Sequence, residues 1–511
     1  MSNKNYVYNI LTSVLFLSIS TIFTCNAQKV PAPEKYINNR TSVEPNKTPI
    51  APTRCALTAI YENDSTPENE IQKRKQYEKS EPEKISYYKG RAPTPEEIEL
   101  AKEPQLFTVH FSGFVKPEFF WDSRQTVGSR NDQILIYPEP KELDRCGRDI
   151  QATPAFEMIA IESRVRADIV GPDVLGAHAK AAIEADFYGV NESTCNVFRM
   201  RHAYTVLDWE TIELLFGQYW HPIYISECTP DTIAGNAGAP MDPFKRAPQI
   251  RFTKRFKPFE FTIAALSEIH FNNDGPIGPS CIYLRDAVIP DLSARCMAHY
   301  NSHIYGIAVD LKRLVPRIKT DLNLKVEESI YSAACSVFTT FNWESFILRL
   351  KATVAQNAAD LSLLGGYAVH SIQPESDKRT YTSLQSLSVW ADFNRANSNI
   401  EPGCFIGFAK NIGASKNIIP ALKKDDELHH LTYGFGTEIV DYVFRIQPRV
   451  RWFVKPVVFG LELEYTRASY GQPNIRGKNA DRPSYLHPDE HPICPGPTAN
   501  TRVYFAAIYY F

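Results

Sequence analysis

The sequence lacks an excess of either charge and, beyond its first residues, any long apolar run. Its 511 residues carry a formal net charge of −2, and 43% of them are hydrophobic. The balanced charge argues against a nucleic-acid binder, which needs basic residues to displace counterions from phosphates. The missing apolar runs disfavour a polytopic helical membrane protein, and the overall composition disfavours a disordered chain.

Cysteines are sparse for a chain of this length. Ten occur, without a CxxC pair and without the spacing of a zinc site. Such sparse cysteines do not make a disulfide scaffold, although some could pair in an oxidising compartment. We interpret them as scattered thiols of loops and strands, and the pairing of the nine that follow residue 27 stays open.

The one apolar stretch, residues 10–24, predicts export from the cytoplasm. It is short for a bilayer crossing and ends in Cys-Asn-Ala ahead of Gln28. Small residues at this place are typical of a cleavage site, so we expect residues 1–27 to be a signal peptide. Lipidation at Cys25 is the weaker alternative, because bulky residues come before it.

Residues 28–105 differ in composition from the rest of the chain. They are rich in proline, glutamate, lysine and asparagine and contain few apolar residues that could form a core. We interpret them as a flexible periplasmic extension with short helical pieces. The best candidate helix covers residues 94–102 and begins with Thr94-Pro95, since proline is favoured in the first turn.

From Phe107 onward, apolar and polar residues alternate with a period of two. In residues 157–169, for example, Val165 and Ile169 alternate with Arg164 and Arg166. This alternation is typical of strands that have one apolar and one ionic face. The strands of a water-soluble sandwich alternate in the same way. The spacing of the strands therefore has to decide between a soluble sandwich and a membrane barrel.

The spacing favours a barrel in a membrane. Sixteen strands can be placed, and the links between them are alternately short and, with one modest exception, long. Such links are typical of an up-and-down meander in an outer membrane, where only a closed barrel leaves no unpaired edge. We therefore expect an all-β, transmembrane up-and-down antiparallel β-barrel of about 16 strands over residues 106–511. The expected strands are 107–120, 157–169, 176–188, 197–208, 211–219, 248–256, 259–269, 291–300, 303–311, 331–343, 345–357, 384–395, 404–411, 442–453, 456–467 and 500–511.

The last strand gives an independent indication. Counting back from Phe511, every second residue is aromatic or apolar, while Arg502 faces the other way. A terminal strand of this kind looks like the C-terminal signature of bacterial outer-membrane barrels. We therefore expect the protein in a bacterial outer membrane, although a soluble protein can also end in an aromatic strand.

If the apolar face meets lipid, the ionic face lines the lumen, where basic residues outnumber acidic ones. Arginine stays charged and presents a planar fork to carboxylates and phosphates, so such a wall favours anions. The alternative is that these arginines are struts paired with acids. For Arg164 and Arg166 the two interpretations are even; for Arg445, Arg449 and Arg451, whose own strand has no acid, solute binding is the better one. The expected pore-lining residues are Arg164, Arg166, Arg199, Arg201, Arg251, Arg349, Arg445, Arg449, Arg451 and Arg502.

The link at residues 220–247 is the expected constriction. Its length, its place after the fifth strand and its small residues suit a loop that folds into the lumen. Glu227, Asp231 and Asp242 would then face the arginines across a narrow opening, and a transverse field of this kind orients dipolar solutes. The alternative is an ordinary external loop.

Signals of catalysis are poor. Residues 487–491 have the HxxEH spacing of some metalloproteases, but Pro488 and Pro492 oppose the helix that this motif needs. Neither a GxSxG motif nor a phosphate-binding glycine loop occurs. We therefore expect no enzyme, no catalytic residue, no metal and no cofactor.

Several motifs resemble the DcaP-like family of trimeric outer-membrane porins. The match lies in FRMRHAY at 198–204, FGQYW at 216–220, APQIRF at 247–252 and shorter runs over most of residues 107–511. The resemblance implies a sixteen-stranded homotrimeric channel that prefers small negatively charged solutes such as dicarboxylates. It also implies that Arg199, Arg201 and Arg251 match the family's inward basic residues. The amino-terminal extension lacks the family's coiled coil. His202 is expected on the outward face, where a subunit interface would explain it.

The sequence thus predicts a porin that allows passive diffusion of small, preferably anionic solutes. The alternative is a non-conducting barrel that acts as a structural or adhesin-like surface protein through its external loops. The expected partners are small anionic solutes, outer-membrane lipid and further copies of the chain in a homotrimer, with no nucleic acid. The identity of the solute and the role of residues 28–105 stay open.

Overall fold

The computed structural model divides the chain into two units, Met1–Ala92 and Pro93–Phe511. The structure describes residues 107–419, 431–435, 440–473, 479–480, 493–494 and 496–511, all in the second unit. The predicted signal peptide, the extension at 28–105 and the HxxEH segment lie outside the described residues.

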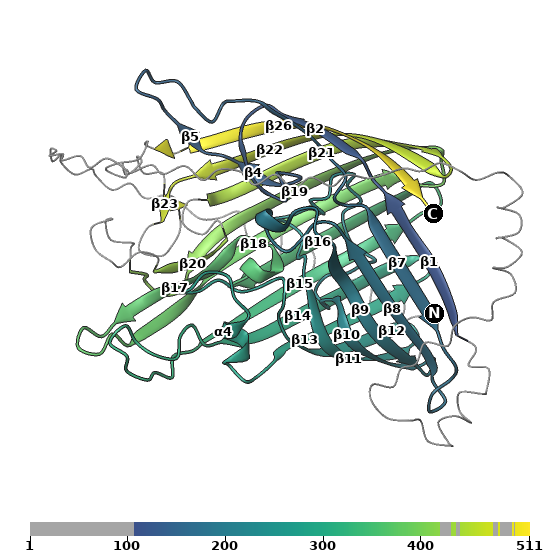
Figure 1. The fold of residues 1–511 in the computed structure, drawn as a ribbon, viewed down its shortest axis with the longest axis horizontal. Coiled ribbons are helices and arrows are strands. Elements are labelled where there is room, and N and C mark those ends of the chain that lie inside the picture. Colours follow the sequence, from purple (N-terminus) through teal and green to yellow (C-terminus); the bar gives the residue numbers. More distant parts are fainter. Residues whose placement is uncertain (1–106, 420–430, 436–439, 474–478, 481–492, 495) are drawn as a thin grey trace, which may run out of the picture. The chain divides into compact units, whose positions relative to one another are not determined.

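The second unit is a closed antiparallel β-barrel of 16 strands (Figure 1). Two barrel strands are interrupted, and two shorter strands extend the sheet at one rim, which accounts for the 20 elements of the sheet. The barrel strands are β1 (Thr108–Val115) with β2 (Glu118–Asp122), β6 (Ala155–Ile159) with β7 (Arg164–Val170), β8 (His178–Asp186), β9 (Arg199–Asp208), β10 (Ile212–Trp220), β11 (Arg246–Phe256), β12 (Phe259–Leu266), β13 (Asp291–Tyr300), β14 (His303–Leu314), β15 (Ile330–Asn342), β16 (Phe346–Gln356), β18 (Arg379–Arg395), β19 (Ile400–Ala414), β21 (Val440–Val454), β22 (Val457–Tyr470) and β26 (Gly496–Tyr510). The predicted fold class and strand count are confirmed.

The barrel closes between the first and last strands. Phe114 pairs with Tyr510 in the β1–β26 ladder, and β2 continues this pairing along β26. Gly113 and Phe511 exchange two backbone hydrogen bonds of 3.1 and 3.2 Å. A Cβ atom on Gly113 would lie 2.2 Å from the backbone carbonyl oxygen of Arg164 on the neighbouring strand and 2.8 Å from the ring of Phe511, so this position requires glycine.

The links between barrel strands alternate in length as predicted. The turns at 257–258, 301–302 and 455–456 are among the short links at one end, and the long loops lie at the other. At the long-loop rim, β17 (Gly365–Ile372) pairs with the first part of β18 and with β20 (Thr432–Phe435).

The outer surface of the barrel is apolar. Along β22, Leu461, Leu463 and Tyr465 are exposed, while Glu462 and Glu464 between them are buried inside. Near the short turns, exposed aromatic side chains form a girdle of the kind that flanks the lipid-facing band of outer-membrane barrels. It includes Phe256, Phe259, Trp343, Phe346 and Trp452. In the described part of the chain, none of the helices combines the length and the apolar character that crossing a membrane requires.

Two breaks in the strands differ from the prediction. β1 stops before Lys116 and Pro117, because proline has no N–H to give to the ladder. Between β6 and β7, the N–H of Ser163 donates to the carbonyl of Ala160 at 3.2 Å and forms a turn. Ile161, expected on the outward face, is therefore buried.

A register shift in β9 corrects the predicted orientation of two side chains. Glu184 pairs with His202, but the next residue pairs with Met200, so Arg201 is a bulge that reverses the alternation beyond it. His202 is therefore only 2% exposed and lies near Glu184 in the lumen. Tyr204, also expected outward, receives a hydrogen bond from Arg166 at 3.0 Å.

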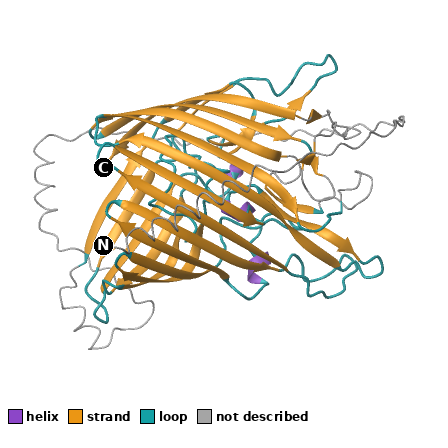
Figure 2. Ribbon diagram, turned by 180° about the vertical axis from the view of Figure 1, so that it is seen from behind, coloured by secondary structure: helices purple, strands orange, loops and turns teal. Residues whose placement is uncertain are grey.

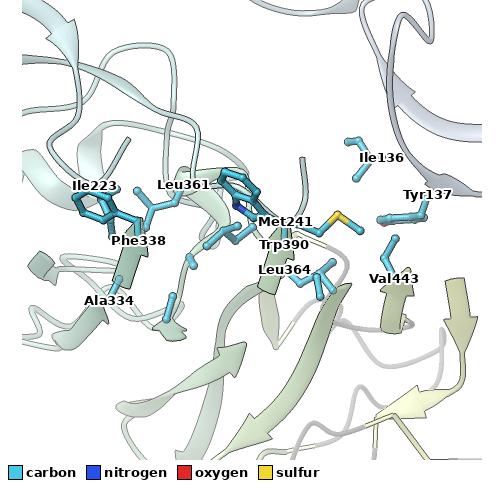
Figure 3. Close-up of a cluster of buried hydrophobic side chains, with 14 of the residues drawn as sticks. Ile136, Tyr137, Ile223, Met241, Ala334, Phe338, Leu361, Leu364, Trp390 and Val443 are labelled. Atoms are coloured by element: carbon cyan, nitrogen blue, oxygen red, sulfur yellow. The ribbon is translucent and has the colours of Figure 1, made fainter. Parts of the chain in front are cut away.

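Three segments fold into the barrel and fill one side of its lumen (Figure 2). They are residues 123–138, which include β3 (Thr126–Ser129) and β4 (Ile134–Pro138), residues 221–245, and residues 357–364 with a short 3₁₀ turn. Their apolar side chains pack with those of the wall in one buried cluster (Figure 3). The cluster includes Ile136, Tyr137, Ile223, Met241, Phe338, Leu361, Leu364, Trp390 and Val443. The seven cysteines whose side chains are described are free thiols.

Candidate functional site

Residues 221–245, which link β10 to β11, cross the lumen and bind the opposite wall. The backbone N–H groups of Ile233 and Ala234 donate to the carboxylate of Glu462 at 2.9 and 3.1 Å. Asn236 donates to Glu464 at 2.9 Å. Gly460 makes room for this contact, since a Cβ there would lie 2.8 Å from the side chain of Ile233. We call this segment the inward loop.

The three acids predicted in the inward loop have different surroundings. Asp242 is buried, 2.9 Å from the ammonium of Lys351, and accepts a hydrogen bond from the indole of Trp390. Burial raises the pKa of Asp242, against the opposing charge of Lys351. Asp231 forms an ion pair with Arg451. Glu227 is exposed and accepts a hydrogen bond from the neighbouring Ser226.

A second segment inside the barrel, residues 123–138, was not predicted. Its backbone carbonyls accept hydrogen bonds from wall arginines: Arg502 donates to Gln133 at 3.0 Å, and Arg445 donates to Ile136 at 2.8 Å. Tyr470 donates to the carbonyl of Pro138. The sequence carried no signal for this placement beyond the inward arginines themselves.

Between the inward loop and the other side of the wall lies a cavity of about 320 Å³. Five cationic and two anionic side chains line it, together with seven aromatic ones. The cations are Lys116, Arg164, Arg199, Arg201 and Arg451; the anions are Glu162 and Asp231; the aromatic residues are Phe114, Tyr188, Trp220, Tyr224, Phe244, Phe453 and Tyr510. Four of the ten predicted pore-lining arginines therefore surround this space, and Lys116 was not among the predicted residues.

Ion pairs and aromatic rings hold the cavity arginines in place. Arg199 donates to Asp186 at 2.7 Å, and Arg201 bridges Glu184 and Asp186 at 2.6 and 2.8 Å. Arg164 is more loosely held, 3.6 Å from Glu184, and its Nε has no hydrogen-bond partner among the described groups. Each of the four guanidinium groups lies over a ring, a favourable arrangement for a cation. The pairs are Arg164 with Phe114, Arg199 with Tyr188, Arg201 with Trp220 and Arg451 with Phe453.

Three other predicted arginines are enclosed by the segments that fill the lumen. Arg445 and Arg502 are fully buried, and Arg449 is nearly so. Each forms an ion pair with an acid on another strand or element. The pairs are Arg445–Glu464 at 3.0 Å, Arg449–Asp392 at 2.7 Å and Arg502–Asp122 at 2.7 Å.

The last three predicted arginines are anchored on the wall outside the cavity lining. Their contacts are Arg166 with Asp168 and Glu184, Arg349 with Asp392 at 3.2 Å, and Arg251 with the carbonyl of Trp220 and the side chain of Gln249. For Arg445 and Arg449 the acid comes from another strand, and for Arg451 it comes from the inward loop and from β19.

Arg246 is a basic residue of the lumen that the sequence did not single out. It is 3% exposed and lies over the rings of Trp220, Phe244 and Phe271, with centroid distances of 4.9, 5.4 and 5.2 Å. Its Nε and Nη1 have no hydrogen-bond partner, and no described acid forms an ion pair with it. It adds an uncompensated positive charge beside Trp220, which also lines the cavity.

A closed sixteen-stranded barrel with a loop folded into its lumen is the fold of outer-membrane channels. Among solved structures, the chain is similar to the outer-membrane channel DcaP of Acinetobacter baumannii, with a TM-score of 0.55 and 15% identity. The match covers 79% of this chain and 97% of that one. The fold that the resemblance to DcaP-like porins implied is therefore confirmed.

More distant matches are to an anion-selective porin from Comamonas acidovorans and to a trimer form of OmpT from Vibrio cholerae. Their TM-scores are 0.44 and 0.45, at 8% and 10% identity, and each match covers 79% of this chain. The matches cover 100% of the porin from Comamonas acidovorans and 99% of OmpT. No protein-family model and no curated protein sequence matches the chain.

Proposed function

We propose that the protein is an outer-membrane porin for passive diffusion of small, preferably anionic solutes. The observation that carries this proposal is the charge of the cavity, whose lining has five cationic and two anionic side chains. A low-dielectric wall of one dominant sign concentrates solutes of the opposite sign. The lining therefore favours anions over cations.

The arginines around the cavity keep part of their surface available to a solute. The side chains of Arg164 and Arg451 are 23% and 20% exposed. Because each lies over an aromatic ring, the guanidinium plane is held in place while its free edge can receive a carboxylate or a phosphate. We assign the attraction of solutes to Arg164, Arg199 and Arg451. Arg201 is 4% exposed and already bridges two acids, so it holds the wall in place.

The inward loop is proposed to limit the size of the solute. It is fixed to the wall at Glu462 and Glu464 and packs on Gly460, so it divides the lumen. A cavity of about 320 Å³ is at the lower end of small-molecule sites, which favours compact solutes.

We also propose that the barrel lies in a bacterial outer membrane and assembles as a homotrimer. The apolar outer surface and the aromatic girdle support the location. The homotrimer follows from the resemblance of the sequence to DcaP-like porins. Chemical cross-linking of the detergent-solubilised protein tests it, and a monomeric band alone would contradict it.

The reversal potential in a planar bilayer under a salt gradient tests the function. We expect channel steps and a potential of the sign given by anion preference. The double variant Arg164→Gln, Arg199→Gln should shift the potential toward cation preference. Arg148→Gln is the matched control, because this arginine lies in a loop with 82% of its side chain exposed. Absence of channel steps would instead support the non-conducting surface protein.

A further inference from the structure

The structure brings together a histidine and two aspartates at the base of the inward loop. His221 follows β10 directly, Asp291 begins β13, and Asp310 lies in β14. One ligand atom from each of the three lies within 4.8 Å of the other two. His221 and Asp291 are completely buried, and Asp310 is 3% exposed. The three residues are far apart in the sequence, so no local sequence motif predicts the cluster.

Each of the three side chains has a buried polar atom without a hydrogen-bond partner among the described groups. The Nε2 atom of His221 lies 3.2 Å from Asp310 and 3.6 Å from Asp291, yet it makes no hydrogen bond. The facing Oδ1 of Asp310 also has no partner among the described groups. In Asp291 the oxygen nearest to His221, Oδ2, accepts a hydrogen bond from Lys245 at 3.5 Å, and the other oxygen, Oδ1, has no described partner. Buried polar atoms are normally paired, so unpaired atoms on all three side chains of one cluster indicate that something else binds there.

The buried side chains around this cluster carry an excess of negative charge, which also favours a bound cation. With the imidazole of His221 neutral, the buried network contains four carboxylates but only two lysines, which leaves two negative charges uncompensated. Its members are Glu268, Asp291, Asp310, Asp360, Lys245 and Lys312. All of them are 5% exposed or less. An uncompensated buried charge is strongly destabilising, and one divalent cation would supply the missing charge.

We propose that His221, Asp291 and Asp310 bind a divalent transition-metal ion, with Zn²⁺ as the fitting member of that class. Imidazole nitrogen with carboxylate oxygen is a zinc donor set, whereas calcium and magnesium are bound by oxygen atoms. Bonds of about 2.0–2.1 Å in a tetrahedron place neighbouring ligand atoms roughly 3.3–3.4 Å apart. The two distances from His221 bracket this value.

Such an ion would fix the first residue of the inward loop to two strands of the wall. The last residue of the loop, Lys245, already belongs to the same network through Asp360 at 2.5 Å. Metal binding at Nε2 places the imidazole proton on Nδ1, which now lies 3.3 Å from the N–H of Ile223. That contact must therefore lengthen when the metal binds. In the alternative, no metal binds, the contact between His221 and Ile223 remains, and protons balance the charge.

The test uses the untagged full-length protein, stripped with a chelator and dialysed against Zn²⁺. We expect one bound zinc per chain by elemental analysis. His221→Gln and Asp310→Asn should each abolish this zinc or weaken its binding at least about tenfold. His178→Gln is the matched control, because it removes an exposed histidine that lies 2.9 Å from an aspartate, and it should bind zinc as the parent does.

Two results would overturn the proposal: a parent protein without zinc, or site variants that bind as much as the parent. If the variants do not fold, Co²⁺ in the parent protein replaces them as the probe. A visible spectrum of four-coordinate Co²⁺ supports the site. Failure to bind Co²⁺ would mean that protons balance the charge instead, and a six-coordinate spectrum would contradict the four-coordinate site.

Discussion

The two sides of the lumen use the same residue type in opposite ways. On the cavity side, Arg164 and Arg199 have partly exposed guanidinium groups over aromatic rings. On the packed side, where the inward segments fill the lumen, Arg445 and Arg449 are buried and paired with acids. Both pairs lie on the ionic face of alternating strands.

The difference teaches that burial, and not residue type or strand face, separates solute-facing arginines from structural ones. An enclosed guanidinium has its hydrogen bonds satisfied by the protein, so it has none to offer a solute. A guanidinium at the edge of a cavity keeps donors that a passing anion can use. The two groups should therefore respond differently to the same kind of substitution.

The largest loss of stability is expected from Arg449→Ala on the packed side. This arginine donates to both oxygens of Asp392, at 2.7 and 3.0 Å, and both side chains are buried. Removing one partner of a buried ion pair typically costs about 3–5 kcal/mol. Denaturant unfolding should show this loss. The reversal potential should keep its sign, and a shift as large as that of the cavity variants would erase the distinction between the two sides.

The next largest effect is expected from removing the proposed zinc. At a free zinc concentration of about 100 times Kd, binding to the folded state alone adds about 2.7 kcal/mol to the free energy of unfolding. A chelator should remove this increment, measured by the same denaturant titration. In Asp310→Asn the chelator should change nothing, so an equal effect there would place the metal elsewhere.

A smaller loss of stability is expected from Gly460→Ala, which crowds the inward loop. The added methyl would lie 2.8 Å from Ile233, and overpacking of this kind typically costs about 1–3 kcal/mol. Because the loop must shift, single-channel conductance should also change. Gly171→Ala is the control, since its methyl meets only the ring of Phe107 at 3.3 Å and lies in a turn. Equal conductance in both variants would show that the loop does not set the opening.

The smallest loss of stability is expected from Arg164→Gln on the cavity side. Its partner Glu184 is 3.6 Å away, and the arginine is partly exposed, so the pair contributes about 0–1 kcal/mol. The reversal potential should nevertheless move toward cation preference. A large loss of stability without any change in the potential would assign Arg164 to the structural group.

Much of the barrel could be predicted because alternation and turn length are local properties. Each of the sixteen strands follows from apolar residues at every second position between short and long links. The bulge at Arg201 could not be predicted, since it depends on how β8 and β9 pair. The turn before Ser163 likewise forms only with a partner strand in place, which is why Ile161 and His202 were assigned to the wrong face.

The contents of the lumen were less predictable, since partners there come from distant parts of the chain. Small residues and length indicated the inward loop, but nothing in residues 123–154 distinguished Ile136 and Tyr137 from residues of an external loop. The partner of Arg449 lies on β18, and no pattern within β21 reveals it. The three proposed zinc ligands likewise meet only when the first residue of the inward loop lies against the paired strands β13 and β14.

The seam between Gly113 and Phe511 has a consequence for how the molecule is made. The strand that is synthesised first must wait for residues 502–511 before one of its edges finds a neighbour. Until then the growing sheet is open and has two edge strands with unpaired backbone groups, which can pair with another copy of the chain. Contacts between such distant residues also form slowly. Biogenesis should therefore depend on chaperones that shield the early segment.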